Sequence, residues 1–176
     1  NHVAKMYPPN ILIGHSIGGK ACLHYQTIHK NSSVEKMVVL GAPSDFKAIF
    51  ENYVSLLGLN SKVNIGLVNY YKDNFNLSNK EIEGLLFSNE TTLKGLIAHD
   101  IEDTVVAFAE AKKNANAWKE AIFIETKGLG HSMNDEALFE KISSFNKIRK
   151  VRTKCCFNFN TYSCADFIVH KINFGM

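Results

Sequence analysis

The stretch Asn10–Leu23, NILIGHSIGGKACL, decides the fold of this chain. Its apolar start, Ile11–Ile13, is typical of a short buried strand, and its second half favours a helix. Between the two lies GHSIG (residues 14–18), which matches the motif G-x-S-x-G. A strand that turns abruptly into a helix at Ser16 would place the hydroxyl at the helix N-terminus, where free N–H groups favour developing negative charge. We therefore expect Ser16 to be a nucleophile and the N–H of Ile17 to bind an oxyanion.

Three further apolar runs extend this pattern. Together with residues 10–13, the runs 37–40, 96–98 and 121–124 predict four strands. None of the runs alternates polar and apolar residues, which is typical of parallel strands covered on both faces. Helical stretches separate the runs, and the last helix is expected to begin at Asn134. The predicted fold class is therefore α/β, a parallel sheet with flanking helices.

Residues 44–93 are far more than a crossover between two strands needs, and they predict an all-helical insertion. Over 46–57, apolar residues recur at three- and four-residue steps on one helix face, and Gly58 provides a stop. Further helices are expected at 63–75 and 78–86. We expect the insertion to be a lid over the carboxyl edge of the sheet. Its aromatic stripe would belong to the core, to a binding surface, or to both.

A serine at neutral pH needs a base and an acid that orients the base. The segment ETKGLGHSMNDE places His131 in a loop after the fourth apolar run. The segment LIAHDIEDTVV places Asp100, Glu102 and Asp103 after the third run. Because the carboxyl ends of parallel strands meet at one edge of a sheet, we expect these loops to lie beside Ser16.

These segments resemble the nucleophile, acid and histidine segments of α/β-hydrolase-fold serine hydrolases. IGHSIGG, LIAHDIEDTVV and ETKGLGHSMND occur in the order typical of that family, and FENYVSLLGLNSKV resembles the lid of a bacterial group within it. The resemblance covers about residues 3–147. The family's acid segment is commonly H-G-x-x-D-x-x-V, which places the catalytic carboxylate at Asp103, with His99 and Val106 at the flanks. Asp100 stands where glycine is commonest.

The resemblance implies an enzyme, a serine hydrolase (EC 3) of the esterase or lipase type that cleaves an ester, thioester or amide. Ser16 would attack the carbonyl of a small-molecule substrate, and His131 would take the serine proton and later protonate the leaving group. Asp103 would hold the imidazole, and water would release the acyl group. Acyl transfer to an acceptor other than water stays open. The alternative from another class is a non-catalytic module of this fold that binds a ligand or a partner.

Several other residues near the motifs have expected roles. Asp45, which follows the second apolar run, is the alternative acid. Asp100 and Glu102 are expected to be solvated loop charges, whereas His15 and His99 are expected to pack or to form hydrogen bonds. No His or Cys spacing resembles a metal-ligand pair, and GHSIGGK lacks the spacing of a phosphate-binding loop. We therefore expect neither a metal nor a cofactor.

The family's sheet has eight strands in the spatial order 1-2-4-3-5-6-7-8, and the four runs found here correspond to the fifth to eighth. The resemblance thus implies a partial domain over residues 1–148, the C-terminal portion of the fold. The chain begins with Asn rather than Met, so its recorded start is not expected to be the genetic one. The family's second oxyanion N–H comes from the loop after the third strand; without it, activity would be reduced. The outer edge of the first run would also be unpaired.

Charge and cysteine content divide the chain near residue 148. Residues 1–145 carry 14 Lys and Arg against 16 Asp and Glu, a formal charge of −2, whereas residues 146–176 carry 6 against 1, a charge of +5. The basic tail, residues 149–176, also holds three of the four cysteines. It is interpreted as a disordered tail, a docking segment or, as the change in composition favours, residues not native to the gene product. The main body gives no indication of a nucleic-acid partner.

The apolar runs are all short. None approaches the run of about 18 consecutive apolar residues that a membrane span needs, so we expect no membrane association. The cysteines form no disulfide framework, which indicates a reducing compartment, and we expect the cytoplasm.

Overall fold

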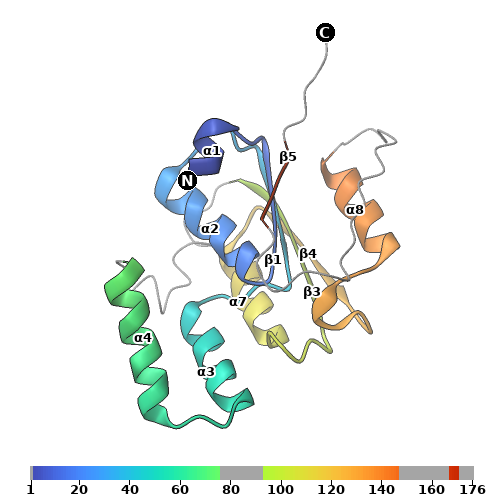
Figure 1. Cartoon of the computed structure of the whole chain (residues 1–176). Helices are drawn as coiled ribbons and strands as arrows, with labels where there is room; N and C mark the ends of the chain where they lie inside the picture. The colour runs from blue at the N-terminus through green and yellow to red at the C-terminus, as the bar shows by residue number, and fades with distance from the viewer. Residues whose placement is uncertain (1, 76–92, 147–166, 171–176) are drawn as a thin grey trace.

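The computed structural model describes residues 2–75, 93–146 and 167–170. Within these residues the core is a five-stranded sheet in the order β4-β3-β2-β1-β5 (Figure 1). The strands are β1 (Ile11–His15), β2 (Lys36–Leu40), β3 (Lys94–Asp100), β4 (Ala121–Thr126) and β5 (Phe167–His170). β1 to β4 pair in parallel, and β5 pairs with β1 in the antiparallel direction. The four predicted strands and the predicted α/β class are therefore confirmed.

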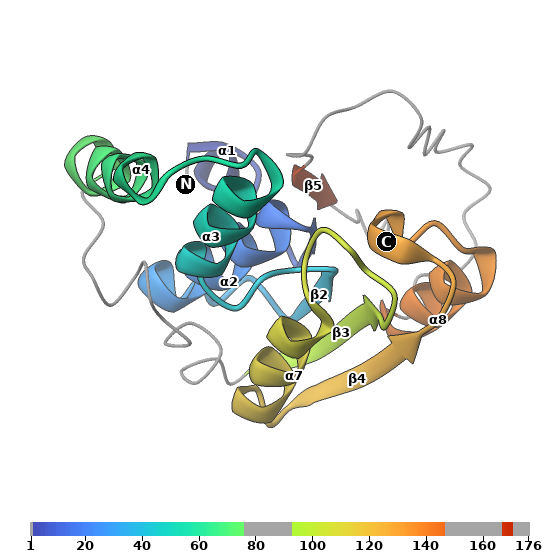
Figure 2. The same ribbon diagram turned by 90° about the horizontal axis from the view of Figure 1, so that it is seen from below.

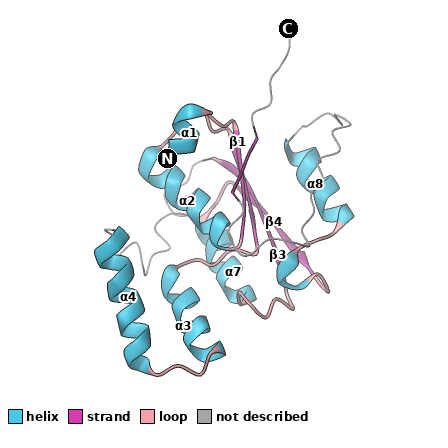
Figure 3. Ribbon diagram, in the orientation of Figure 1, coloured by secondary structure: helices cyan, strands magenta, loops and turns pink. Residues whose placement is uncertain are grey.

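Helices cover both faces of this sheet (Figures 2 and 3). The helices are α1 (His2–Met6), α2 (Ile17–His29), α3 (Phe46–Leu56), α4 (Ser61–Phe75), α7 (Phe108–Ala117) and α8 (Glu136–Asn146), with a 3-10 turn η1 at Gly130–Ser132. α2 and α7 lie on one face and α8 lies on the other. α3 and α4 lie near the start of α2, beyond the carboxyl ends of the strands.

The burial of β2 explains why the central strands do not alternate. Successive side chains of a strand point to opposite faces of the sheet. Met37 and Val39 belong to the cluster under α2 and α7, whereas Val38 and Leu40 belong to the cluster under α8. All four are buried, so a continuous apolar run is required there. The prediction of strands covered on both faces is correct for this strand.

The same prediction is wrong for β4. Ile122 is 55% exposed, Glu125 is also exposed, and the other four residues of the strand are half-buried. β4 lies at the edge of the sheet, and a shallow groove between β4 and α8 leaves Ile122 in contact with solvent. A strand at the edge of the sheet can therefore be half-exposed although its sequence is apolar. The amino-acid sequence of the strand does not show that it lies at the edge.

The outer edge of β1 was expected to be unpaired, and this expectation is also wrong. β5, from the basic tail, pairs with β1 so that Ile11 lies opposite His170 and Gly14 lies opposite Phe167. The ladder gives the backbone groups of β1 partners on both sides. The rest of the tail lies outside the described residues, and its interpretation stays a prediction.

The insertion between β2 and β3 contains two described helices, as predicted, and the expected third helix at 78–86 lies outside the described residues. α3 ends at Leu56, two residues before Gly58, which has a φ of +60°. Phe50 is buried, but Tyr53 and Leu56 are 50% and 76% exposed, so the apolar stripe of α3 is only partly core. Across the described parts of the chain, no helix has the length and apolar character needed to cross a membrane.

Candidate active site

Ser16 lies between the end of β1 and the start of α2, where the chain reverses sharply. Its backbone has φ 53° and ψ −127°, a conformation that costs a residue with a side chain on the order of 1–3 kcal/mol. The N–H of Ser16 donates to the Leu40 carbonyl at 2.8 Å, which fixes the turn against β2. A Cβ at Gly14 would lie 2.5 Å from the Gly18 carbonyl oxygen, so glycine is required there. The abrupt turn predicted from the sequence is present.

Gly19 has a role that the sequence alone does not reveal. A Cβ at this position would lie 2.7 Å from the Ala42 Cβ and 2.9 Å from a Val39 methyl group. Glycine therefore allows α2 to approach the end of β2. The signal in the sequence was the second glycine of IGG, one residue beyond the motif.

Ser16, His131 and Asp103 form a chain of hydrogen bonds. The Ser16 Oγ is 3.0 Å from the His131 Nε2, and the His131 Nδ1 is 2.8 Å from the Asp103 Oδ2. His131 lies in η1 after β4, and Asp103 lies in the loop after β3. The Asp103 side chain is fully buried, whereas the His131 side chain is 16% exposed. The structure thus brings together the three residues expected from the sequence.

Four hydrogen-bond donors surround the Asp103 carboxylate. One oxygen accepts the N–H groups of Val105 and Val106 at 2.8 and 2.9 Å, and the other faces both His131 and His99, the latter at 3.2 Å. Burial raises the pKa of Asp103, but the hydrogen bonds from His131, His99 and the two N–H groups outweigh it. The net pKa lies far below its ordinary range, and the group is a carboxylate at neutral pH.

His99 and His15 form hydrogen bonds beside this chain, as expected. The His99 Nε2 also lies 2.9 Å from the Val106 carbonyl oxygen, and its side chain is buried. The His15 Nε2 donates to the carbonyl oxygen of His131 at 2.7 Å. Burial lowers the pKa of His15, and this outweighs the opposing effect of the bond to the His131 carbonyl. His15 is therefore a neutral support for the backbone of His131.

Asp100 corrects an expectation, because it is completely buried and not a solvated loop charge. Its carboxylate accepts the N–H of Glu102, the hydroxyl of Thr126 and the N–H of Leu129, each at 2.9 Å. Burial raises the pKa of Asp100, but these hydrogen bonds outweigh it and hold the pKa below its ordinary value. Asp100 therefore joins the acid loop to the loop that carries His131. Glu102 is exposed, as expected.

Asp45, the alternative acid, has a different neighbour. Its carboxylate lies 3.4 Å from the hydroxyl of Ser44, whereas the carboxylate hydrogen-bonded to His131 is that of Asp103. The geometry therefore favours Asp103 as the acid. Ile17 is the first residue of α2, directly after Ser16, which is the position expected for an oxyanion donor.

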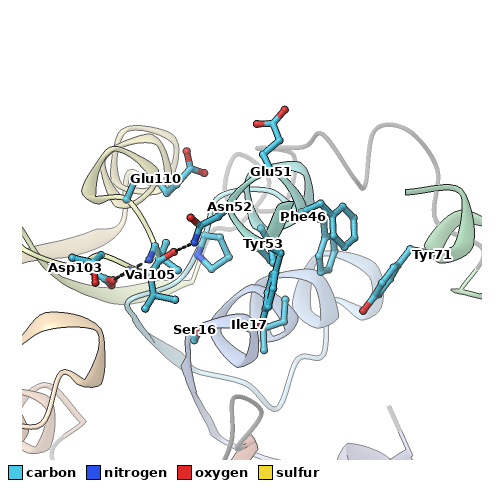
Figure 4. Close-up of a pocket in the computed structure, with 16 residues that line it drawn as sticks. Ser16, Ile17, Phe46, Glu51, Asn52, Tyr53, Tyr71, Asp103, Val105 and Glu110 are labelled. Atoms are coloured by element: carbon cyan, nitrogen blue, oxygen red, sulfur yellow. Dashed lines mark hydrogen bonds between the residues drawn. The ribbon is translucent and has the colours of Figure 1, made fainter. Parts of the chain in front are cut away.

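A cavity of about 490 Å³ opens beside Ser16 (Figure 4). One wall consists of apolar and aromatic side chains of the β2–α3 segment, α3 and α4: Pro43, Phe46, Ile49, Phe50, Tyr53 and Tyr71. The acid loop and α7 also line the cavity, with Thr104, Val105, Val106 and Glu110 among their residues, and Asn52 of α3 completes the lining beside them. Asn52 donates to the carbonyl oxygen of Val105, and this bond links α3 to the acid loop. The aromatic stripe expected to be core or binding surface thus lines this cavity.

No metal site is evident in the described ranges, since no group of three or more His, Cys, Asp or Glu side chains is arranged to hold a metal ion. The polar groups beside Ser16 are instead engaged with one another by hydrogen bonds.

The sheet order, the flanking helices and the site at the carboxyl edge are those of part of an α/β-hydrolase fold, and comparison with solved structures agrees. An esterase domain of a Rhodothermus marinus protein has a TM-score of 0.61 and 17% identity, with 83% of this chain and 64% of that chain covered. An esterase from Rhodococcus sp. ECU1013 has a TM-score of 0.57 and 14% identity, with 83% and 69% covered. Mouse alpha/beta hydrolase domain-containing protein 10 has a TM-score of 0.55 and 17% identity, with 79% and 62% covered.

This chain thus spans 64% of the length of the Rhodothermus domain. No protein-family model matches the sequence, and no curated protein matches it significantly. The fold is therefore recognised from the arrangement of the chain in space.

Proposed function

We propose that this chain carries the catalytic residues of a serine hydrolase that cleaves an ester, thioester or amide through an acyl-enzyme. The observation that carries the proposal is the hydrogen-bonded chain from the Ser16 hydroxyl through His131 to Asp103, at the mouth of a cavity. Esterases among the solved structures of the same fold support the esterase subtype.

In the proposed mechanism, the Asp103 carboxylate accepts the Nδ1–H of His131, which leaves the Nε2 lone pair directed at Ser16. As the Ser16 oxygen attacks the substrate carbonyl, its proton moves to the His131 Nε2, and the carbonyl oxygen becomes an oxyanion near the N–H of Ile17. The bond to the leaving group breaks as His131 returns the proton to it. Water, activated by the same histidine, then attacks the acyl-serine and releases the acid.

The cavity walls support a substrate with an apolar acyl group. Burying an apolar group against aromatic and aliphatic side chains is favourable by about 25 cal/mol per Å². The wall formed by Phe46, Ile49, Phe50 and Tyr53 begins next to Ser16, where the acyl group of an acyl-enzyme would lie. We refer to this cavity as the acyl pocket.

Covalent labelling tests the proposal. A fluorophosphonate probe reacts with a serine only where a base activates its hydroxyl. The wild-type chain is expected to be labelled, Ser16→Ala is expected not to be, and Ser55→Ala, at an exposed position on α3, is expected to label like the wild type. A folded wild-type chain that is not labelled would contradict the proposal and favour a non-catalytic binding module.

A further inference from the structure

Lys20 is a lysine that lies inside the protein. It is in α2, four residues after Ser16, and only 1% of its surface is exposed. Its ammonium group donates to the carbonyl oxygen of Ser44. Burial lowers the pKa of Lys20 to about 8, and the carboxylates of Asp45 and Glu110 partly oppose this effect. A buried cation is costly unless it is paired and hydrogen-bonded, and the Ser44 carbonyl and the two carboxylates offset part of this cost.

Glu110 of α7 holds the same segment from the other side. Its Oε2 accepts the backbone N–H of Ser44 at 3.1 Å and also accepts the Ser44 hydroxyl. The Asn114 side chain, from the next turn of α7, donates to the Ala42 carbonyl oxygen at 3.3 Å. Side chains of α2 and α7 thus hold the segment 41–46 at Ala42 and Ser44.

This segment contacts both parts of the candidate active site. Gly41 has a φ of +53°, and a Cβ at this position would lie 3.6 Å from both the Asp103 Oδ2 and the His131 Nδ1. Pro43 and Phe46, farther along the segment, line the acyl pocket. The position of the segment therefore affects the shape of the pocket directly, through Pro43 and Phe46.

We propose that Lys20 is a positioning residue for the acyl pocket: its ammonium group fixes residues 41–46 and thereby sets the apolar wall at Pro43 and Phe46. Lys20 does not line the pocket, and its Nζ lies 5.8 Å from the centre of the Phe46 ring. It therefore acts through the segment and not on the substrate. The inference rests on the proposed function, since it names the residue that shapes the pocket of that same site.

Steady-state kinetics of Lys20→Met with two p-nitrophenyl esters test this role. Methionine keeps an apolar stem of similar length and removes the cation. We expect KM for the octanoate to rise about tenfold or more, with kcat changed less than about threefold, because substrate binding and not the reacting groups is altered. KM for the acetate should change by less than about threefold, because its short acyl group can bury little surface against the part of the wall at Pro43 and Phe46. In Lys20→Arg, which keeps the cation, KM for the octanoate should return most of the way to the wild-type value.

Controls make the outcome decisive. Lys119→Met removes an exposed lysine and should leave both KM values unchanged. Glu110→Gln weakens the hydrogen bonds that the Glu110 carboxylate accepts from Ser44 and should also raise KM for the octanoate. This variant replaces Lys20→Met in the test if Lys20→Met does not fold. The inference is overturned if the wild type is active and KM for the octanoate is unchanged in folded Lys20→Met. If Lys20→Met does not fold, an unchanged KM for the octanoate in Glu110→Gln overturns it instead. Absence of hydrolysis and of fluorophosphonate labelling in the wild type would instead overturn the proposed function.

Discussion

The Asp100 carboxylate accepts the backbone N–H of Leu129 at 2.9 Å, and Leu129 lies two residues before His131. The acid loop after β3 is therefore joined to the histidine loop after β4 by a buried anion. The two loops supply Asp103 and His131, so that the bond at Asp100 helps to determine how well the two side chains meet.

Asp100→Asn tests this bond. Asparagine keeps the shape but replaces one oxygen with a donor, so at least one of the N–H or O–H groups directed at it loses its acceptor. We expect the free energy of unfolding to fall by about 2 kcal/mol or more, measured by urea unfolding, since an unsatisfied buried donor costs about 1–3 kcal/mol. We also expect a lower kcat. Glu102→Gln, at the exposed position two residues later, is the matched control and should be neutral within about 0.5 kcal/mol.

Asp103→Asn separates the two candidate acids. Because the amide cannot accept the Nδ1–H of His131 as the carboxylate does, we expect kcat to fall by about 10³–10⁴, as when the acid of a serine protease triad is replaced. Asp45→Asn should lower kcat by less than about tenfold. Measured kcat values in the reverse order would assign the acid to Asp45.

Gly19→Ala tests the approach of α2 to β2. The added methyl group would lie 2.7 Å from the Ala42 Cβ, so the helix or the strand has to shift. Overpacking of this kind typically costs about 1–3 kcal/mol, and the melting temperature should fall accordingly. Gly66→Ala provides the control, because no atom lies within 4 Å of the new Cβ on α4. There the better helix propensity of alanine should raise stability by up to about 1 kcal/mol.

Stability should fall in acid because of Asp100 and Asp103. Both have pKa values below their ordinary range in the folded state, so their contribution is fully present above about pH 4, the usual pKa of an unfolded aspartate, and is lost as the pH falls toward the folded values. The free energy of unfolding, measured from pH 6 down to pH 3, should therefore decrease. In Asp100→Asn the decrease should be smaller, and an equal decrease would contradict the role of that carboxylate.

The sequence predicted the elements whose signals are local. Ile11–Ile13 followed by a glycine and serine motif indicated the strand, the turn and the helix, and the order of the three motifs led to His131 and Asp103. Two of the partners of Asp100, Thr126 and Leu129, lie more than 20 residues away, and no local pattern reveals such a contact. The burial of Lys20 was missed for the same reason.

The two edge strands of the sheet were harder to predict than its central strands. The run at Ile122 has the composition of a buried strand, but a position at the edge leaves it half-exposed. β5 at Phe167–His170 has a short apolar run, FIVH, in a tail whose overall composition argued against regular structure. The average composition of residues 149–176 does not indicate that four of them, Phe167–His170, pair with β1.

The backbone of Ser16 has a further consequence. A conformation with φ 53° and ψ −127° is one that glycine adopts with little strain and serine does not, so the wild-type residue opposes the stability of its own fold. A chain with glycine at position 16 would hold the same turn under less strain and would have no nucleophile. If Ser16 is the nucleophile, its hydroxyl is needed for activity while its backbone conformation is strained. Thermal stability and activity then favour different residues at this one position.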